Sequence, residues 1–226
     1  MSPEPSKMSV AADTVCLRCG HRGAPEVLLV KRAYNPYKDS WAFPGGFVEL
    51  DEDLWEAARR EVQEETGLYP VTFDQVGAWG KPGRDPRGRT VSAVYCAIAD
   101  PEDSDVVGAD DAAEAKWHSL GRLPSLAFDH DEILPVVLDH FRDRCERTHF
   151  IFAFLPETFT ETDLKNVLES FEVPGPGKKA RRLLDASVSV ESGGMGQYRL
   201  DVSRYIMPLR EPVCMFPISS SEESRR

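Results

Sequence analysis

Three glutamates in one stretch of the chain, Glu61, Glu64 and Glu65, have a spacing that could hold a metal ion. A helix turns about 100° per residue, so positions i, i+3 and i+4 share one face. Residues 45–68 carry eight acidic side chains and two arginines, and such crowding costs stability through repulsion. A divalent cation removes the conflict, because Mg²⁺ takes oxygen ligands and commonly works with substrate phosphates. The spacing therefore predicts a site where a pyrophosphate meets a metal ion.

The residues around these glutamates suit such a site. Pro44-Gly45-Gly46 precedes the predicted helix, and glycine lets a backbone carbonyl approach a metal or ligand closely. Arg60 can hold a carboxylate through a forked ion pair, and Glu52 lies near the helix N-terminus, where the helix dipole favours negative charge. A charged, solvated surface helix is the alternative interpretation. That alternative is disfavoured because a solvated face would gain from interspersed lysines, and this face has none.

The whole stretch resembles the Nudix box, G-x5-E-x7-R-E-U-x-E-E-x-G-U, in which U is an apolar residue. The matching positions are Gly46, Glu52, Arg60, Glu61, Val62, Glu64, Glu65, Gly67 and Leu68. The resemblance implies an α/β (α+β) fold, in which a mixed sheet is sandwiched between helices. It also implies Mg²⁺- or Mn²⁺-dependent hydrolysis of a nucleoside diphosphate linked to another moiety. In that family the residues matching Glu61, Glu64, Glu65 and the Gly45 carbonyl bind metal, and those matching Arg60 and Glu52 hold the loop–helix–loop together.

The general base of such a reaction stays open at this level. Metal ions lower the pKa of the attacking water, and a carboxylate completes its deprotonation. Glu64 or Glu65 could serve as that base. In parts of the family the base comes from a later loop, where the acidic candidates are Glu102, Asp105, Asp110, Asp111 and Glu114.

Segments on both sides of the box resemble the ADP-ribose branch of the same family. They are residues 30–54 and 116–134, and the resemblance implies hydrolysis of ADP-ribose to AMP and ribose 5-phosphate. Aromatic faces can stack on a base and an arginine can meet a phosphate, although core packing or a surface ion pair is the alternative for each. The candidate substrate-binding residues are Arg32, Tyr37, Trp41 and Phe47. Asp129 and His130 are expected instead to cap the helix that follows them.

Composition limits the classes of function. The chain has 226 residues, of which 41% are hydrophobic and 29% charged, as in an ordinary globular protein with room for a large domain and a small one. Its net charge of −11 opposes nucleic-acid binding except through a local basic patch. No apolar run reaches the roughly 18 residues of a membrane span, and the N-terminus lacks the apolar core of a secretion signal. A cytoplasmic protein without membrane contact is therefore expected.

The cysteines favour neither disulfides nor zinc. Five cysteines are an odd number, which does not suit a disulfide framework. Cys16-Leu-Arg-Cys19 looks like half of a zinc site, but no second Cys-x-x-Cys follows and zinc takes four ligands. Cysteines within a strand and its turn are the favoured interpretation.

The elements that must position the glutamates follow from hydrophobic periodicity and turn residues. A helix is expected over 53–66, capped by Asp51 or Asp53 and stopped by Gly67. The segment 130–145 is predicted to be a second helix, and 99–115 an acidic loop. Strands are predicted at 10–17 and 27–32, as a hairpin, and at 71–80, 89–98 and 115–120.

After about residue 148 the acidic excess disappears. We expect a helix over 160–171 with Thr160 as its cap, a basic helix over 177–186 and then a hairpin, which is the order of a winged helix-turn-helix. The predicted organisation is a flexible N-terminus (1–8), a Nudix domain (9–148), a winged-helix-like domain (150–212) and a flexible tail (213–226).

The second helix suggests an alternative function. Lys178, Lys179, Arg181 and Arg182 could contact DNA phosphates, although a solvated helix would carry the same residues. The order of domains resembles a subgroup of the ADP-ribose branch that contains transcriptional regulators of NAD metabolism. The resemblance implies an ADP-ribose-sensing, DNA-binding regulator as the alternative to an enzyme. A homodimer is expected in either case.

Overall fold

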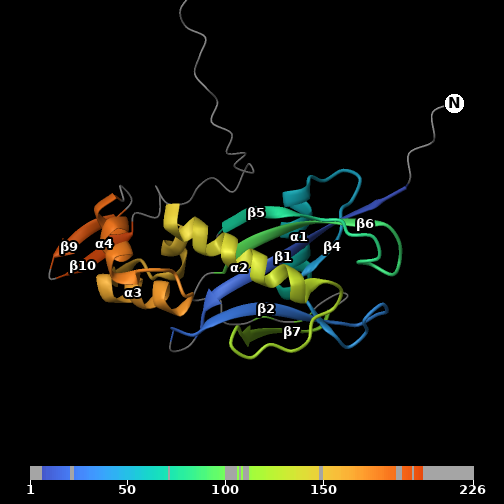
Figure 1. Cartoon of the computed structure of the whole chain (residues 1–226), viewed down its shortest axis with the longest axis horizontal. Helices are drawn as coiled ribbons and strands as arrows, with labels where there is room; N and C mark the ends of the chain where they lie inside the picture. The colour runs from blue at the N-terminus through green and yellow to red at the C-terminus, as the bar shows by residue number, and fades with distance from the viewer. Residues whose placement is uncertain are drawn as a thin grey trace, which may run out of the picture.

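The computed structural model describes residues 7–20, 23–70, 72–99, 106, 108, 112–147, 150–186, 190–194 and 196–200. Within these ranges the larger part of the chain is one mixed sheet with a long helix on each face (Figure 1). The sheet is composed of β1 (Ser9–Cys19), β2 (Pro25–Arg32), β3 (Trp41–Ala42), β4 (Gly45–Phe47), β5 (Thr72–Trp79), β6 (Thr90–Ile98) and β7 (Ala112–Ser119).

Strand β1 is the centre of this sheet. It pairs in parallel with β6 along its length and antiparallel with β2 and β4 at its two ends. The order β3-β2-β1-β6-β5, with β4 on β1 and β7 on β2, makes the sheet mixed, as expected. The expected hairpin of the first two strands is confirmed by the pairing of Leu17 with Val27.

Both faces of the sheet are covered by helices, which explains why the central strands carry apolar side chains on both faces. Side chains of successive residues in a strand point to opposite faces. Val15 and Leu17 pack in the core that contains α2 (His130–Arg147), whereas Ala12 and Cys16 pack towards α1 (Leu54–Thr66). In Figure 1 α2 crosses in front of the sheet.

Helix α1 begins and ends as its sequence predicts. Asp53 is the N-cap, and its side chain and that of Glu56 form a reciprocal capping box. Gly67 follows the helix in the left-handed conformation, with φ of 74°, which is accessible to glycine at little cost. Helix α2 presents a stripe at four-residue spacing, Ile133, Val137, Phe141 and Cys145, to the core.

One loop prediction was wrong in part. The acidic segment 99–115 was expected to be a loop throughout. Strand β7 instead begins at Ala112 and pairs with β2. Ala112 and Ala115 are buried against Val30, so packing on a formed sheet outweighs the weak strand preference of alanine and glutamate.

The C-terminal part is a pair of helices with a small sheet. It contains a short 3-10 turn η2 (Phe150–Phe154), β8 (Thr158–Thr160), α3 (Glu161–Ser170), α4 (Pro176–Ala186), β9 (Val190–Gly194) and β10 (Gln197–Leu200). Thr160 caps α3 through the predicted box with Asp163. The helix, basic helix and hairpin are confirmed, whereas β8, which pairs with β10, was not foreseen. Residues 201–226, which include the end of the predicted domain and the tail, lie outside the described residues.

An apolar cluster continues across the predicted domain boundary. The Phe141 ring of α2 lies 5.6 Å from that of Phe154 and 4.7 Å from that of Phe171, which follows α3. The end of α2 is therefore packed on the C-terminal helices. None of the helices in the described ranges is long and apolar enough to cross a bilayer.

Candidate active site

Arg60 binds several of the carboxylates on and before α1. Its guanidinium makes the forked ion pair expected of it with Glu52, at 2.9 Å from Nε and 2.7 Å from Nη2. Nη1 also binds Glu61 and Glu64, each at 2.9 Å, and Nη2 donates to the carbonyl of Phe47. The hydrogen bond with Glu52 is the main cause that raises the pKa of Arg60. Arg60 thereby ties the loop before α1 to the middle of the helix.

Glu65 is the buried member of the predicted metal set, at 8% exposure. Its Oε2 accepts a hydrogen bond of 2.9 Å from the backbone N–H of Gly45, so the helix and the glycine strand are joined at this point. Burial is the main cause that raises the pKa of Glu65 to about 8; the charges of Glu61 and Asp13 contribute to the rise, and the Gly45 hydrogen bond opposes it. Burial likewise raises the pKa of Glu61.

These carboxylates line a pocket of about 520 Å³. Glu61, Glu64 and Glu65 form one part of its wall, and Gly45 and Arg32 contribute to the rest. Arg32 comes from the end of β2 and Gly45 from β4, so the fold brings together four of the predicted metal-site residues and one predicted substrate residue. Its lining also includes Arg87, which the sequence did not single out.

The residues present fit a divalent cation by charge and shape. Glu65 and Glu61 are carboxylates whose ionised forms burial disfavours, and a cation is the group that would stabilise both. Gly46 lies so close to Glu61 that a Cβ there would collide with the carboxylate. Within the described ranges no three His, Cys, Asp or Glu side chains already converge as a ligand set. Metal binding would therefore require Glu61 and Glu64 to exchange their contacts with Arg60 for contacts with the ion.

The predicted aromatic residues lie around the pocket rather than in its lining. Tyr37 packs its ring 4.8 Å from that of Phe128, and Trp41 packs edge-on to His118 at 4.5 Å. Phe47 is 41% exposed, and the guanidinium of Arg87 lies 4.7 Å above its ring. Trp41 is thus occupied by a packing contact, whereas Phe47 presents a face near the pocket.

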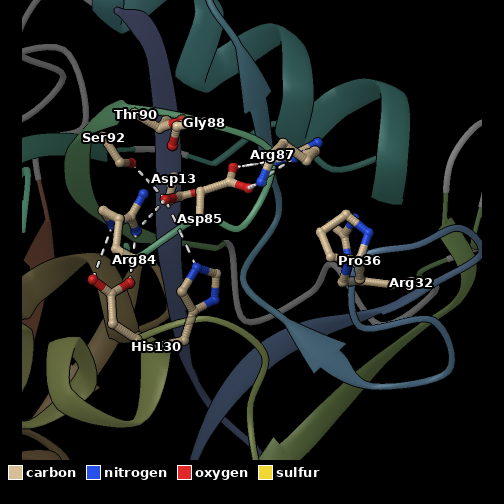
Figure 2. Close-up of polar contacts among 11 residues, drawn as sticks. Asp13, Arg32, Pro36, Arg84, Asp85, Arg87, Gly88, Thr90, Ser92 and His130 are labelled. Carbon is tan, nitrogen blue, oxygen red and sulfur yellow. Dashed lines mark hydrogen bonds and ion pairs between the residues drawn. The ribbon is translucent and has the colours of Figure 1, made fainter. Parts of the chain in front are cut away.

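A buried polar network that the sequence did not reveal surrounds Asp13 (Figure 2). Asp13 of β1 is 8% exposed; it accepts a 2.5 Å hydrogen bond from Ser92 and faces Arg84 at 3.6 Å and His130 at 3.8 Å. Burial opposes its charge, but His130, Ser92 and Arg84 together lower the pKa of Asp13. Arg84 in turn makes two hydrogen bonds, of 2.9 and 2.7 Å, to Asp129.

His130 connects this network to the glycine strand. Its Nδ1 accepts a 3.0 Å hydrogen bond from the backbone N–H of Phe43, and its ring stacks on the Phe43 ring at 4.4 Å. The tautomer with the proton on Nε2 follows from that hydrogen bond and directs the proton towards Asp13. Asp129 directly precedes α2, as expected of a cap, and its backbone carbonyl accepts from Glu132 and Ile133, while its carboxylate binds Arg84.

The remaining predicted residues are placed as follows. Glu114 is exposed on β7, opposite Lys31, and Glu102, Asp105, Asp110 and Asp111 lie outside the described residues. Cys16 lies within β1, as predicted, and the strand extends two residues further than predicted, so that Cys19 is its last residue rather than part of the turn. Lys179 is buried at 8% exposure, whereas Lys178, Arg181 and Arg182 line an open surface of α4.

Comparison with known proteins identifies the family of the domain that the sheet and its two helices form. A family model for the NUDIX domain matches residues 8–141. The chain is 46% identical over 109 residues to the ADP-ribose pyrophosphatase of Methanocaldococcus jannaschii, an alignment that covers 48% of this chain and 63% of that protein. It is 31% identical over 177 residues to the ADPR responsive transcriptional repressor NtrR of Acinetobacter baylyi, covering 76% of this chain and 70% of the repressor.

Solved structures show the same similarity in three dimensions. A MutT/nudix family protein from Enterococcus faecalis superposes with a TM-score of 0.75 at 27% identity, over 88% of this chain and 89% of that one. Shewanella oneidensis NrtR complexed with a 27mer DNA gives 0.69 at 26% identity, over 84% and 93%. The NUDIX domain of the same protein complexed with ADP ribose gives 0.56 at 27% identity, over 61% and 90%.

Proposed function

The chain belongs to the NUDIX family, and on that premise we propose that it hydrolyses the pyrophosphate bond of a nucleoside diphosphate linked to another moiety. ADP-ribose is the proposed substrate, and AMP and ribose 5-phosphate the products. The observation that carries the proposal is the pocket in which Glu61, Glu64 and Glu65 face the same space as Arg32. The similarity to an ADP-ribose pyrophosphatase supports the choice of substrate.

The cofactor of this proposal is Mg²⁺ or Mn²⁺. Glu61, Glu64, Glu65 and the Gly45 carbonyl are the residues that would hold it. When bound, the ion supplies Lewis-acid polarisation of the phosphoryl oxygens and lowers the pKa of the attacking water. The chain's own residues prepare the site, because Arg60 fixes the loop that carries Glu52 and the Gly45 N–H fixes the Glu65 carboxylate.

The test is hydrolysis of a panel of nucleoside diphosphate compounds with Mg²⁺ or Mn²⁺, with products identified by chromatography. Glu64→Gln and Glu65→Gln are each expected to lower kcat by about 10²-fold or more, as loss of a metal or base carboxylate should. Glu49→Gln, which changes an exposed glutamate of the preceding loop, serves as the matched control. Near-normal turnover in both site variants, or no hydrolysis of any compound by the unaltered protein, would overturn the proposal.

A second candidate function is an ADP-ribose-responsive DNA-binding regulator, supported by the basic surface of α4. Lys178, Arg181 and Arg182 lie together there, and Arg181 is weakly paired with Glu161 at 3.6 Å. The similarity to the NtrR repressor extends over 76% of this chain. A homodimer would present two such helices to the two halves of a symmetric DNA site.

A gel-shift titration at low salt with promoter-length DNA tests this candidate. Binding should weaken steeply with salt and change on addition of ADP-ribose. Joint replacement of Lys178, Arg181 and Arg182 by alanine should abolish binding and leave hydrolysis intact, whereas Lys165→Ala on α3 should alter neither. Buried Lys179 is left unchanged so that folding is preserved. Absence of any complex would leave the C-terminal part as an accessory module of a hydrolase.

A further inference from the structure

The pocket has a cationic side that the proposed metal site does not use. Arg87, from the loop between β5 and β6, lines the same cavity as Glu61, Glu64 and Glu65. Its side chain is 43% exposed, so it is open to a ligand while being anchored at its base. Arg87 comes from a part of the chain remote from the Nudix box, and only the fold brings it to the pocket.

A buried carboxylate fixes the direction of the Arg87 side chain. Asp85, whose side chain is 2% exposed, accepts from Arg87 Nε at 3.0 Å and from Nη2 at 2.8 Å, and also from the Arg87 backbone N–H at 2.9 Å (Figure 2). Among the described residues, no hydrogen bond or ion pair engages Nη1. Asp85 therefore holds the Arg87 guanidinium along its Nε–Nη2 edge, and Nη1 can donate hydrogen bonds to a ligand.

Two aromatic rings also contact the Arg87 guanidinium. The guanidinium of Arg87 lies 4.7 Å from the ring centre of Phe47 and 5.7 Å from that of Phe128. Phe128 has a left-handed backbone, with φ of 57°, which is uncommon for a bulky residue and indicates that the surroundings hold it there. The same ring carries the guanidinium of Arg32 at 4.8 Å. Two cations thus share one aromatic ring at the pocket.

Two guanidinium groups that line one cavity offer hydrogen-bond donors to an anionic ligand. The same cavity is lined by the carboxylates that would hold a cation, so the pocket offers both acidic and basic groups. A diphosphate matches both kinds of group at once, because its oxygens can bridge a metal ion and a guanidinium fork. A neutral sugar or base offers no such match.

We propose that Arg87, held by Asp85 and stacked between Phe47 and Phe128, is a substrate-binding residue that donates to the phosphoryl oxygens of a diphosphate ligand in this pocket. The assignment deepens the proposed hydrolase function and rests on it for the identity of the full substrate. It makes Asp85 a positioning residue, since that carboxylate faces the arginine and not the cavity. Phe47 takes part as a support for the guanidinium.

The test compares Arg87→Ala and Arg87→Lys with Arg89→Ala, which removes an exposed arginine two residues away in the same loop. Calorimetric titration uses inorganic pyrophosphate with Mg²⁺ as one probe and adenosine as the other. Loss of a charge-assisted hydrogen bond corresponds to about ten-fold or more in Kd. Arg87→Ala should weaken pyrophosphate binding by that factor and leave adenosine binding unchanged, and Arg87→Lys should recover only part of the loss because lysine lacks the fork.

Kinetics then separate this assignment from the proposed function. With ADP-ribose, Arg87→Ala should raise KM about ten-fold or more, whereas Arg89→Ala should match the unaltered protein. Unchanged pyrophosphate affinity and unchanged KM in Arg87→Ala would overturn the assignment even if the protein is an active hydrolase. If the unaltered protein hydrolyses nothing but binds pyrophosphate through Arg87, the binding assignment holds and the hydrolase proposal fails.

Discussion

The burial of Glu65 predicts how the stability of the metal-free protein depends on pH. Its pKa is raised from 4.5 to about 8 in the folded protein, chiefly by burial. The folded state therefore holds a proton that the unfolded state has lost between these two values. By linkage, the contribution of Glu65 to the free energy of unfolding is neutral below about pH 4.5, falls as pH rises and levels off above about pH 8.

The size of this effect follows from the shift. At about 1.4 kcal/mol per pKa unit, the rise corresponds to a loss of the order of 5 kcal/mol between acidic and alkaline pH. Glu65→Gln removes the titration but keeps an acceptor for the Gly45 N–H. In the metal-free protein, the difference in stability between Glu65→Gln and the unaltered chain should therefore grow by several kcal/mol from pH 5 to pH 8.

Urea unfolding in a chelating buffer at four or five pH values measures this difference. Glu49→Gln is the control, and it should follow the unaltered protein at every pH. Addition of millimolar Mg²⁺ at matched ionic strength should flatten the profile of the unaltered protein, because a cation that binds the folded state stabilises it by mass action. Parallel profiles for Glu65→Gln and the unaltered chain would refute the reasoning that burial and neighbouring carboxylates hold Glu65 protonated.

Three further predictions concern single contacts. Gly46→Ala places a Cβ against the Glu61 carboxylate and should lower kcat about ten-fold or more. The melting temperature should barely change, since the end of the glutamate side chain can move. Full activity would argue against a tight fit between Gly46 and Glu61. Asp129→Ala leaves the buried Arg84 without its two-bond partner and should cost about 3–5 kcal/mol in urea unfolding, and a loss below 1 kcal/mol would contradict the network. Asp53→Ala removes the cap of α1 and should cost about 1 kcal/mol, seen as a fall of a few degrees in melting temperature; an unchanged melting temperature would mean that the cap contributes nothing.

The carboxylate face of α1 could be predicted from the sequence because every feature that creates it is local. Helical periodicity places Glu61, Glu64 and Glu65 on one side, and Asp53 and Gly67 set the two ends of the helix. The long strands β1, β2, β5 and β6 were predicted for the same reason, since their apolar runs are bounded by turn residues, whereas the short strands β3 and β4 were not predicted. The beginning of β7 was missed because its alanines and glutamates have little strand preference of their own and are held by pairing with β2.

The buried polar network around Asp13 was decided by tertiary structure. Asp13 meets Ser92 across 79 residues and Arg84 meets Asp129 across 45, and neither pair leaves a periodic signal in the sequence. The parallel pairing of β1 with β6 sets the first contact, and the packing of the loop before β6 against the start of α2 sets the second. The burial of Lys179 likewise depends on which face of α4 meets its neighbours. The periodicity of one helix thus determines where the carboxylates of α1 lie. Strand register and loop packing, which join residues far apart in the chain, determine which polar side chains meet in the buried network.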